Sequence, residues 1–276
     1  MITKADVQQQ VLQAVDTVQR TNPMVGSITN TVTINFVANA QLAVGGSAAM
    51  VYLPDEAEFL AKAGGAVYIN VGTLLPVYEQ TLPLTAKTLH EAGKPWVLDP
   101  VAVGIGSLRT ALLKQFQVYK PSVIRGNASE IIALAGLWGL DGGAGESKVR
   151  GVDSTVTAAR PAAIALARWT GGAVAVSGKT DLVTDGSVMA FSRGGSDFME
   201  KITGSGCSLG GVAAVYATAA PPFIAALTAT AVYNLAGSRA EHKADGPGSF
   251  QVEFLNELYK ATAADIAGNP LEIEEA

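Results

Sequence analysis

Short apolar segments alternate with longer helix-like segments, and this alternation most constrains what the chain can fold into. The predicted strands are residues 66–71, 96–98, 122–125 and 173–177. The predicted helices are residues 83–92, 108–116, 128–137 and 158–170. Strands this short and apolar are typical of a parallel sheet covered by helices on both faces. We therefore predict an α/β fold with a mainly parallel central sheet and one antiparallel hairpin at 182–191.

No internal repeat or long linker divides the 276 residues, so we expect one domain over residues 1–276. The net charge is −5 without a basic cluster, which argues against nucleic acid and anionic membranes as partners. A single cysteine excludes a disulfide framework and favours a reducing, cytoplasmic setting. The uncharged stretch 202–238 is interrupted by Pro221-Pro222, so we expect two buried helices there and no membrane span.

Polar side chains follow several of the predicted strands at their carboxyl ends, where ligands bind in such sheets. They are Asp99, Arg125, Asn127 and Ser177, with Glu130 three residues beyond Asn127. Asp99 and Glu130 suit Mg²⁺ held through water, and Arg125 suits a polyphosphate. The alternatives are that Asp99 makes a turn before proline, and that Asn127 and Glu130 only cap a helix.

Gly204-Ser205-Gly206-Cys207 precedes an apolar, alanine-rich run that predicts a buried helix. Glycines let the backbone turn tightly and approach a ligand, and a free helix N-terminus attracts anions. Cys207 falls on the first turn, where a thiol is most easily pushed toward thiolate. The alternative is a common glycine turn with a cysteine that acts as a small buried hydrophobe. The next glycine, Gly210, is one position too late for the dinucleotide-binding fingerprint.

Residues 21–54 carry no charge but include Asn30, Asn35 and Asn39. Buried amides in an apolar wall suit recognition of a neutral polar molecule. The alternative is that these asparagines bond to nearby turns and caps. The segment Ser177-Gly178-Lys179-Thr180 resembles the end of a phosphate-binding loop, but its first glycine position is occupied by Ala173. We therefore do not expect a P-loop.

Together these segments resemble the hydroxyethylthiazole kinases, which have a ribokinase-like fold. The matching stretches are residues 28–39, 97–101, 123–131, 151–154, 204–207 and 246–250. The combination of Arg-Gly-Asn-Ala-Ser-Glu at 125–130 with the turn at 204–207 is the specific part. Most ribokinase-like enzymes have an aspartate at the position of Cys207, so the cysteine favours this family.

The resemblance implies a three-layer α/β/α fold and ATP-dependent phosphorylation of 4-methyl-5-(2-hydroxyethyl)thiazole in thiamine biosynthesis or salvage. It also implies Mg²⁺ and a homotrimer with sites at subunit interfaces. The residues implied to bind ATP are Arg125, Ser177 and Asn127, and those implied to organise the metal are Asp99 and Glu130. The residues implied to contact the thiazole are Met50, Gly204 and Asn30. Those implied in phosphoryl transfer are Cys207, Gly204 and Gly206, with Cys207 beside the attacking hydroxyl.

The chain departs from the family at Gly26 and Ser27, where histidine and cysteine are usual, and this affects the expected thiazole pocket. Ser177 and Ser205 replace threonines and keep a hydroxyl. Three alternatives remain: a ribokinase-like kinase of hydroxymethylpyrimidine or pyridoxal, a nucleotide-dependent dehydratase of hydrated nicotinamide cofactors, and a non-catalytic binding protein. A cysteine is a poorer fixed proton acceptor than an aspartate, so we expect Cys207 to help without being indispensable.

Overall fold

The computed structural model describes residues 2–140 and 155–276. Its centre is a nine-stranded sheet in the order β2-β1-β3-β4-β5-β6-β7-β8-β9. The strands are β1 (Met24–Ile28), β2 (Ser47–Met50), β3 (Ala66–Asn70), β4 (Trp96–Asp99), β5 (Val123–Asn127), β6 (Ala173–Ser177), β7 (Thr180–Thr184), β8 (Val188–Arg193) and β9 (Leu271–Glu275). From β2 through β6 all neighbours pair in parallel, whereas β7, β8 and β9 add an antiparallel end. The predicted mainly parallel sheet and its hairpin are confirmed.

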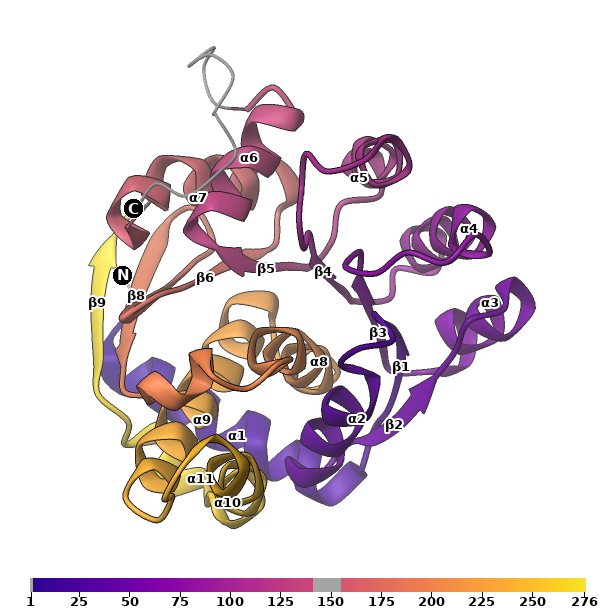
Figure 1. Ribbon diagram of the computed structural model, residues 1–276. Coiled ribbons are helices and arrows are strands. Elements are labelled where there is room, and N and C mark those ends of the chain that lie inside the picture. Colours follow the sequence, from indigo (N-terminus) through magenta and orange to yellow (C-terminus); the bar gives the residue numbers. More distant parts are fainter. Residues whose placement is uncertain (1, 141–154) are drawn as a thin grey trace.

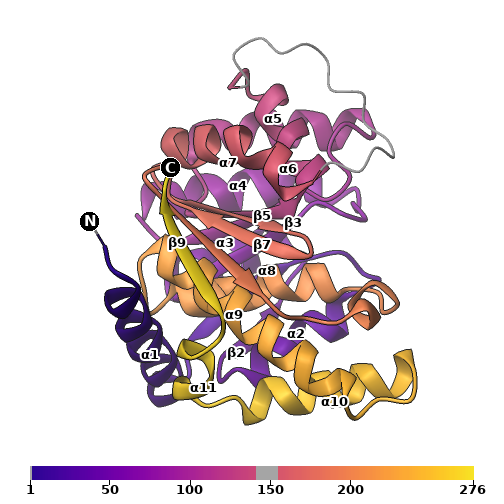
Figure 2. The same cartoon turned by 90° about the vertical axis from the view of Figure 1, so that its left-hand side faces the viewer.

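Helices cover both faces of the sheet (Figure 1). One layer contains α3 (Pro54–Ala63), α4 (Tyr78–Glu91), α5 (Ser107–Tyr119), α6 (Ala128–Leu137) and α7 (Val156–Thr170). The other face carries α2 (Ile34–Ala43), α8 (Ser205–Ala217) and α9 (Pro222–Glu241), after the short 3₁₀ turn η1 (Asp197–Glu200). Behind α9 and α2 lie α1 (Lys4–Thr21), α10 (Pro247–Lys260) and α11 (Ala263–Ala267), and Figure 2 shows these layers from the side.

Two hydrophobic cores lie on the two faces of the sheet, and β3 shows how one strand serves both. Tyr68 packs in the core beneath α8, whereas Val67 and Ile69 pack in the core beneath α3 to α7. Successive side chains of a strand point to opposite faces, so a doubly covered strand is apolar throughout. No helix of the described residues is long and apolar enough to cross a membrane.

Most predicted elements exist, and the differences have local causes. The helix expected from Pro83 begins at Tyr78, so Pro83 lies inside α4 instead of in its first turn. A proline is favoured at a helix start, which is why the sequence suggested one there. The pattern did not predict β1, α2, α3, α10 or β9. The predicted exposed loop at 140–152 and the matching stretch 151–154 lie, apart from Leu140, outside the described residues.

Candidate active site

The carboxyl ends of β3 to β6 form one edge of the sheet, and the pairing register brings polar residues to it. Asn70 of β3 is the partner of Asp99 of β4, and Asn127 of β5 is the partner of Ser177 of β6. Parallel strands end at the same edge, so residues that follow different strands meet there. The predicted grouping of Asp99, Ser177 and Arg125 at this edge is what the structure contains.

Arg125 connects Asp99 to Ser177. Its Nη1 lies 3.6 Å from Asp99 Oδ2, and its Nη2 donates a hydrogen bond of 2.9 Å to Ser177 Oγ. Both charged side chains are buried. Burial raises the pKa of Asp99 to about 7, with Arg125 opposing the rise and Glu130 adding to it. Asp99 is therefore more than a turn residue before proline, because its side chain faces this buried ion pair.

Two atoms of the ion pair are buried without a hydrogen-bond partner among the described residues, Asp99 Oδ1 and Arg125 Nε. An unpartnered buried polar atom costs free energy, so both atoms suit a site that a polar ligand completes. Within residues 2–140 and 155–276 there is no group of three or more His, Cys, Asp or Glu side chains that would hold a metal alone. Mg²⁺ usually takes one or two carboxylates together with water and phosphate oxygens, so Asp99 and Glu130 fit it.

Asn127 and Glu130 form a capping box at the start of α6. Asn127 Oδ1 accepts from the backbone N–H of Glu130, and Glu130 Oε2 accepts from that of Asn127, both at 2.9 Å. Glu130 Oε1 also faces the backbone N–H of Ala102 at 3.4 Å. The capping interpretation is thus confirmed, and the hydroxyl of Ser129 also donates to Asn127 Oδ1. A ligand role for either residue would be added to this local one.

The N-terminus of α8 is open. Gly204 adopts φ +93°, and a Cβ there would lie 3.0 Å from Thr33, so both conformation and space favour glycine. The backbone N–H of Ser208 donates to Gly204 O, which leaves the N–H groups of residues 205–207 outside the helical pattern. Such groups, with the positive end of the helix dipole, attract anions.

Arg125 lies against this helix start. A Cβ on Gly206 would stand 2.6 Å from Arg125 Nη1, so only glycine leaves room for the guanidinium. A cation at the positive end of a helix is unfavourable unless negative charge is near. Asp99 supplies part of that charge, and a bound anion would supply the rest. The helix start that the sequence predicts to attract an anion thus has the Arg125 cation beside it, next to N–H groups that have no partner within the helix.

Cys207 is half-buried in the first turn of α8, and its Sγ accepts a hydrogen bond of 3.4 Å from Asn30 Nδ2. Burial, followed by the charge of Asp99, raises the pKa of the Cys207 thiol, although Arg125 and Asn30 act in the opposite direction. Burial and the charge of Asp99 thus act against the thiolate that the helix start was expected to favour. Cys207 also packs partly against the core, as the alternative proposed.

The three asparagines of the uncharged stretch have different surroundings. Asn30 is buried, and it donates from Nδ2 to Asn70 Oδ1 at 3.1 Å and accepts at Oδ1 from the backbone N–H of Thr33. Asn35 and Asn39 instead bond to each other at an exposed position on α2, so they do not belong to the buried cluster. Of the three, Asn30 alone fits recognition of a ligand at this edge.

The remaining predicted positions lie on β1 and β2. Met50 is the last residue of β2, partly buried, and pairs with Ser27 of β1 at the same edge of the sheet. Gly26 points to the other face, where a Cβ would lie 3.2 Å from Leu60 of α3. Gly26, which stands where the family usually has histidine, therefore lies where α3 packs on β1. This is the face of the sheet opposite Tyr68 and α8.

Two residues of the cluster were not predicted, Tyr68 and Asn70. Tyr68 Oη donates to Asp99 Oδ2 at 2.9 Å, and Asn70 Nδ2 donates to the same oxygen at 3.2 Å. Both are fully buried in what the sequence presents as an apolar strand. A polar residue at a strand's carboxyl end was the signal used for Asp99, and it applied equally to Asn70.

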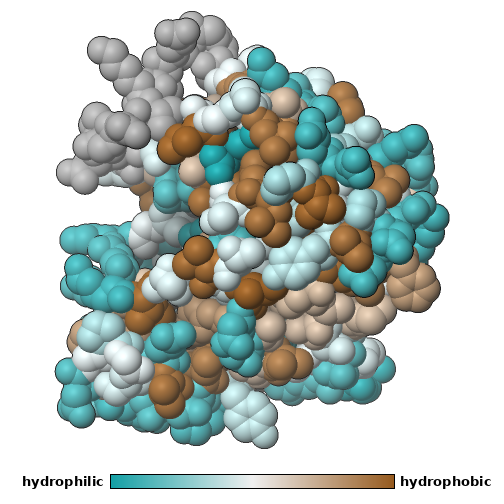
Figure 3. Space-filling model, turned by 45° about the vertical axis from the view of Figure 1, so that its right-hand side comes forward, coloured by the Kyte–Doolittle hydropathy of each residue, from teal (hydrophilic) through white to brown (hydrophobic). Residues whose placement is uncertain are grey.

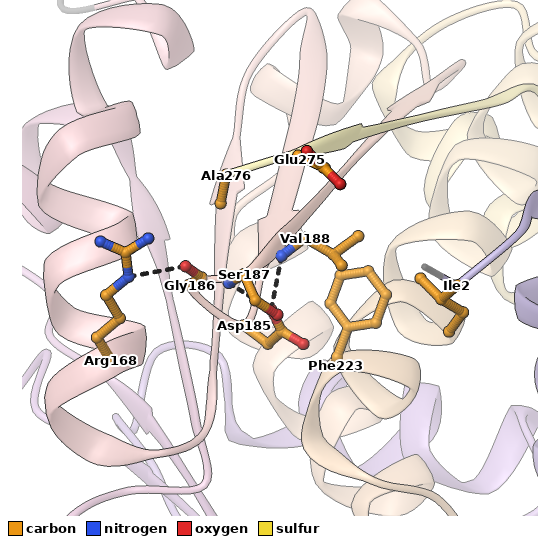
Figure 4. A pocket seen from close by; sticks show the side chains of 9 residues that line it. All are labelled: Ile2, Arg168, Asp185, Gly186, Ser187, Val188, Phe223, Glu275 and Ala276. Carbon is orange, nitrogen blue, oxygen red and sulfur yellow. Dashed lines mark hydrogen bonds between the residues drawn. The ribbon is translucent and has the colours of Figure 1, made fainter.

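A cavity of about 780 Å³ lies away from this edge (Figure 4). It surrounds the β7–β8 turn, and because β7 runs antiparallel to β6, this turn lies at the opposite end of the sheet. Arg168 Nε donates to Gly186 O, and Asp185 Oδ1 accepts from the backbone N–H of Val188, so these polar groups serve the turn itself. None of the predicted site residues lines this cavity.

The fold is similar to that of a kinase and of a ribokinase-like protein whose structures are solved. A pyridoxal kinase from Staphylococcus aureus, solved with AMP-PCP, is similar with a TM-score of 0.60 and 16% identity, over 92% of this chain and 99% of that one. A ribokinase-like superfamily protein from Enterococcus faecalis gives 0.63 and 12%, over 94% and 95%. At such low identities the likeness concerns the fold alone.

The sequence narrows the class. Residues 15–264 match the hydroxyethylthiazole kinase family, and the chain belongs to this family. Hydroxyethylthiazole kinases of Bifidobacterium adolescentis and Bifidobacterium longum are 52% and 49% identical, over 95% and 97% of this chain and 93% and 92% of theirs. The solved hydroxyethylthiazole kinase of Pyrococcus horikoshii has a TM-score of 0.85 at 29% identity, over 97% of this chain and 99% of its own.

Proposed function

We propose that this protein transfers the γ-phosphoryl group of ATP to the hydroxyl of 4-methyl-5-(2-hydroxyethyl)thiazole, in thiamine biosynthesis or salvage. The observation that carries the proposal is the pairing of Arg125 with the open N-terminus of α8, beside Asp99. This is a polyphosphate site in a chain that is 52% identical to a protein named hydroxyethylthiazole kinase. The names of the relatives support the thiazole as the phosphoryl acceptor, and the geometry of the site supports ATP as the phosphoryl donor.

At the donor end, Arg125, Ser177 and Asn127 bind ATP in this proposal. The guanidinium neutralises phosphate charge, and its hydrogen bond to Ser177 fixes its direction. Phosphoryl transfer asks for positioning and charge neutralisation more than for covalent help. The amides at residues 205–207, with Gly204 and Gly206 shaping the turn, are preorganised donors for the charge that develops on the transferred group.

Asp99 and Glu130 would hold Mg²⁺, which would neutralise phosphate charge on bound ATP. The unpartnered Asp99 Oδ1 supports this assignment, because it is a buried carboxylate oxygen still open to a ligand. Glu130 is already fixed by the capping box, so its carboxylate is held in place before any ligand arrives. Its contact with Asn127 thereby ties the metal side of the site to the ATP side.

At the acceptor end, Asn30, Met50 and Gly204 contact the thiazole, and Cys207 lies beside the attacking hydroxyl. Asn30 offers a buried amide in an otherwise apolar wall, which suits a neutral heterocycle. The raised pKa of Cys207 keeps the thiol protonated near neutral pH, so the sulfur orients the hydroxyl more than it removes its proton. This fits a modest catalytic role.

We further propose that residues 1–276 act as one kinase domain in the cytoplasm, where ATP is available, and assemble as a homotrimer. Supporting association, Leu42, Leu53 and Phe59 are 54%, 50% and 66% exposed on or beside α2 and α3, near the edge strand β2. The face that comes forward in Figure 3 carries apolar residues in brown among polar ones in teal. Sedimentation of the wild type and Phe59→Ser tests the trimer, which the substitution should weaken.

The decisive measurement is ADP release by purified protein with ATP and Mg²⁺, comparing the hydroxyethylthiazole with hydroxymethylpyrimidine and pyridoxal. Release with the thiazole alone is the expected result. Release only with another alcohol would keep the phosphate site and discard the substrate. No release with any alcohol would favour the dehydratase or the binding protein.

Two controls sharpen the assay. A 4,5-dimethylthiazole, which lacks the acceptor hydroxyl, should not support ADP release. Asp99→Asn, purified in parallel, should lose most of the activity, and this separates the reaction from any contaminating kinase.

A further inference from the structure

Asn70 lies at the end of β3, completely buried, and makes four hydrogen bonds. Its Oδ1 accepts from the backbone N–H of Gly72 at 2.9 Å and from Asn30 Nδ2 at 3.1 Å. Its Nδ2 donates to Tyr68 Oη at 2.9 Å and to Asp99 Oδ2 at 3.2 Å. A primary amide has two donor hydrogens and an oxygen that accepts twice, so all its capacity is used.

The direction of this amide is fixed by its partners. A backbone N–H only donates, so the side-chain atom that faces Gly72 has to be the oxygen. The nitrogen then faces the acceptor Asp99. Gly72 is also required for space, because a Cβ there would lie 2.9 Å from Asn70 Oδ1 and 3.0 Å from Asn30 Nδ2.

The same logic orients Asn30. Its Oδ1 accepts from the backbone N–H of Thr33, so its Nδ2 has to face Asn70 and Cys207. One hydrogen of this nitrogen goes to Asn70 Oδ1, and the other goes to Cys207 Sγ at 3.4 Å. The sulfur is therefore held as an acceptor. Asn70 stands between Asp99 on one side and the Asn30–Cys207 pair on the other.

We propose that Asn70 is a positioning residue that holds Asp99, on the phosphate side, and the Asn30–Cys207 pair, on the acceptor side, in one fixed arrangement. This rests on the proposed function, in which Asp99 serves ATP and Cys207 serves the alcohol. Asn70 touches neither substrate. Its effect passes through its neighbours, in a reaction where misplacement of about 1 Å costs roughly 10²-fold in rate.

If Asn70 only stabilised the turn after β3, one of its four hydrogen bonds would be enough. The bond from Gly72 N–H to Asn70 Oδ1 closes a turn after β3, and that alone would stabilise the loop. The other three bonds reach Asp99, Tyr68 and Asn30, which lie on two strands and on the segment that follows β1. Tyr68 and Asp99 also bond to each other. Among the described residues, Asn70 is the side chain that hydrogen-bonds to that pair and to Asn30.

The test uses the fact that Cys207 is the only cysteine, so alkylation by iodoacetamide reports on one sulfur. Asn70→Leu removes every hydrogen bond of the side-chain amide and keeps the same branched heavy-atom skeleton. Loss of Asn70 Oδ1 frees Asn30 Nδ2 and weakens its bond to the sulfur. We expect alkylation at fixed pH to slow about three- to tenfold, because hydrogen bonds stabilise the thiolate that reacts. We also expect kcat to fall about 10²-fold.

Tyr68→Phe is the matched control. It removes one hydrogen bond to Asp99 and the acceptor of one Asn70 N–H, but leaves both contacts of Asn70 Oδ1. We expect it to raise the KM for ATP and to leave the alkylation rate unchanged. We expect the same changes in kcat and alkylation rate for Asn70→Ser. This variant is measured instead if thermal unfolding shows that Asn70→Leu does not fold.

The proposal is overturned if the Asn70 variants alkylate at the wild-type rate or faster. It is also overturned if Tyr68→Phe slows alkylation as much as they do, because the effect would then pass through Asp99. Alkylation needs no substrate, so its outcome is independent of which alcohol the enzyme phosphorylates. A failure of the thiazole assay with slowed alkylation would discard the substrate and keep the role of Asn70.

Discussion

The guanidinium of Arg125 occupies the space that a side chain at Gly206 would need, since a Cβ there would lie 2.6 Å from Nη1. One helical turn later, a Cβ on Gly210 would lie 2.5 Å from the ring of Tyr68. Residues four apart share a face of a helix, so both glycines let α8 lie close on the strand ends. Gly210, which does not fit a dinucleotide fingerprint, thus has a packing role.

Alanine at these two positions should separate function from stability. Arg125 Nη1 is the far end of a flexible side chain, so Gly206→Ala should displace the guanidinium and raise the KM for ATP about tenfold or more, with little loss of stability. The ring of Tyr68 is fully buried, so Gly210→Ala should lower the free energy of unfolding by about 1–3 kcal/mol despite the better helix propensity of alanine. Steady-state kinetics and urea denaturation measure the two effects. Equal stability losses with an unchanged KM would contradict this division.

Arg125→Ala should raise the KM for ATP far more than the KM for the thiazole. The substitution removes the cation from the N-terminus of α8 and leaves the carboxylate of Asp99 buried without its ion-pair partner. Arg125→Lys is the control, because it keeps the charge but loses the guanidinium fork that reaches both Asp99 and Ser177. Its KM for ATP should lie between that of the wild type and that of Arg125→Ala. Kinetics with each substrate varied in turn give the comparison. Equal effects on both KM values would remove Arg125 from the ATP site.

Cys207→Ala should lower kcat by about 10²-fold, which is the small end of the range that positioned acid–base groups contribute. The reason is that burial raises the pKa of the thiol, so it is a weak proton acceptor at neutral pH. Cys207→Ser keeps a group that accepts from Asn30 and should retain more activity than alanine. Single-turnover measurements with both substrates saturating isolate this step. A loss beyond about 10⁴-fold in a folded variant would show a larger role.

The sequence predicted the residues whose position follows from topology alone. Asp99, Arg125 and Ser177 end or nearly end neighbouring parallel strands, so alternation of strands and helices was enough to bring them together. The capping box of Asn127 and Glu130 depends on local spacing, and it formed as such spacing allows.

The rest depends on contacts that a single sequence does not reveal. Asn70 belongs to the site because the pairing register of β3 and β4 places it opposite Asp99. Gly26 has little influence on the surroundings of Cys207, because a side chain at this position of β1 would point to the other face of the sheet, toward Leu60. The edge strand β9 exists by pairing with β8, about eighty residues earlier in the chain. Burial and the charge of Asp99 raise the pKa of Cys207, and a rule about helix starts includes neither effect.

Asp181, close enough to Arg125 for the guanidinium to lower its pKa, provides a prediction about stability. It is buried on β7, where Oδ1 accepts from the backbone N–H of Gly178 at 2.8 Å and Oδ2 accepts from Asn234 Nδ2 of α9 at 2.9 Å. Burial raises the pKa of Asp181 to about 6, although both hydrogen bonds oppose the rise. The folded protein therefore binds this proton more tightly than the unfolded chain, whose carboxyl has its ordinary pKa of 3.8.

Between those two values, stability falls as pH rises, because the folded state then holds the extra proton. The contribution of Asp181 is most favourable below about pH 4 and is lost above about pH 6, a change of roughly 3 kcal/mol. Asp181→Asn removes this dependence while keeping an acceptor for Gly178. Urea denaturation of both proteins from pH 4 to pH 7 gives the difference, in which other carboxylates cancel. The wild type should lose stability relative to the variant as pH rises, and a flat difference would mean that burial does not raise the pKa of Asp181.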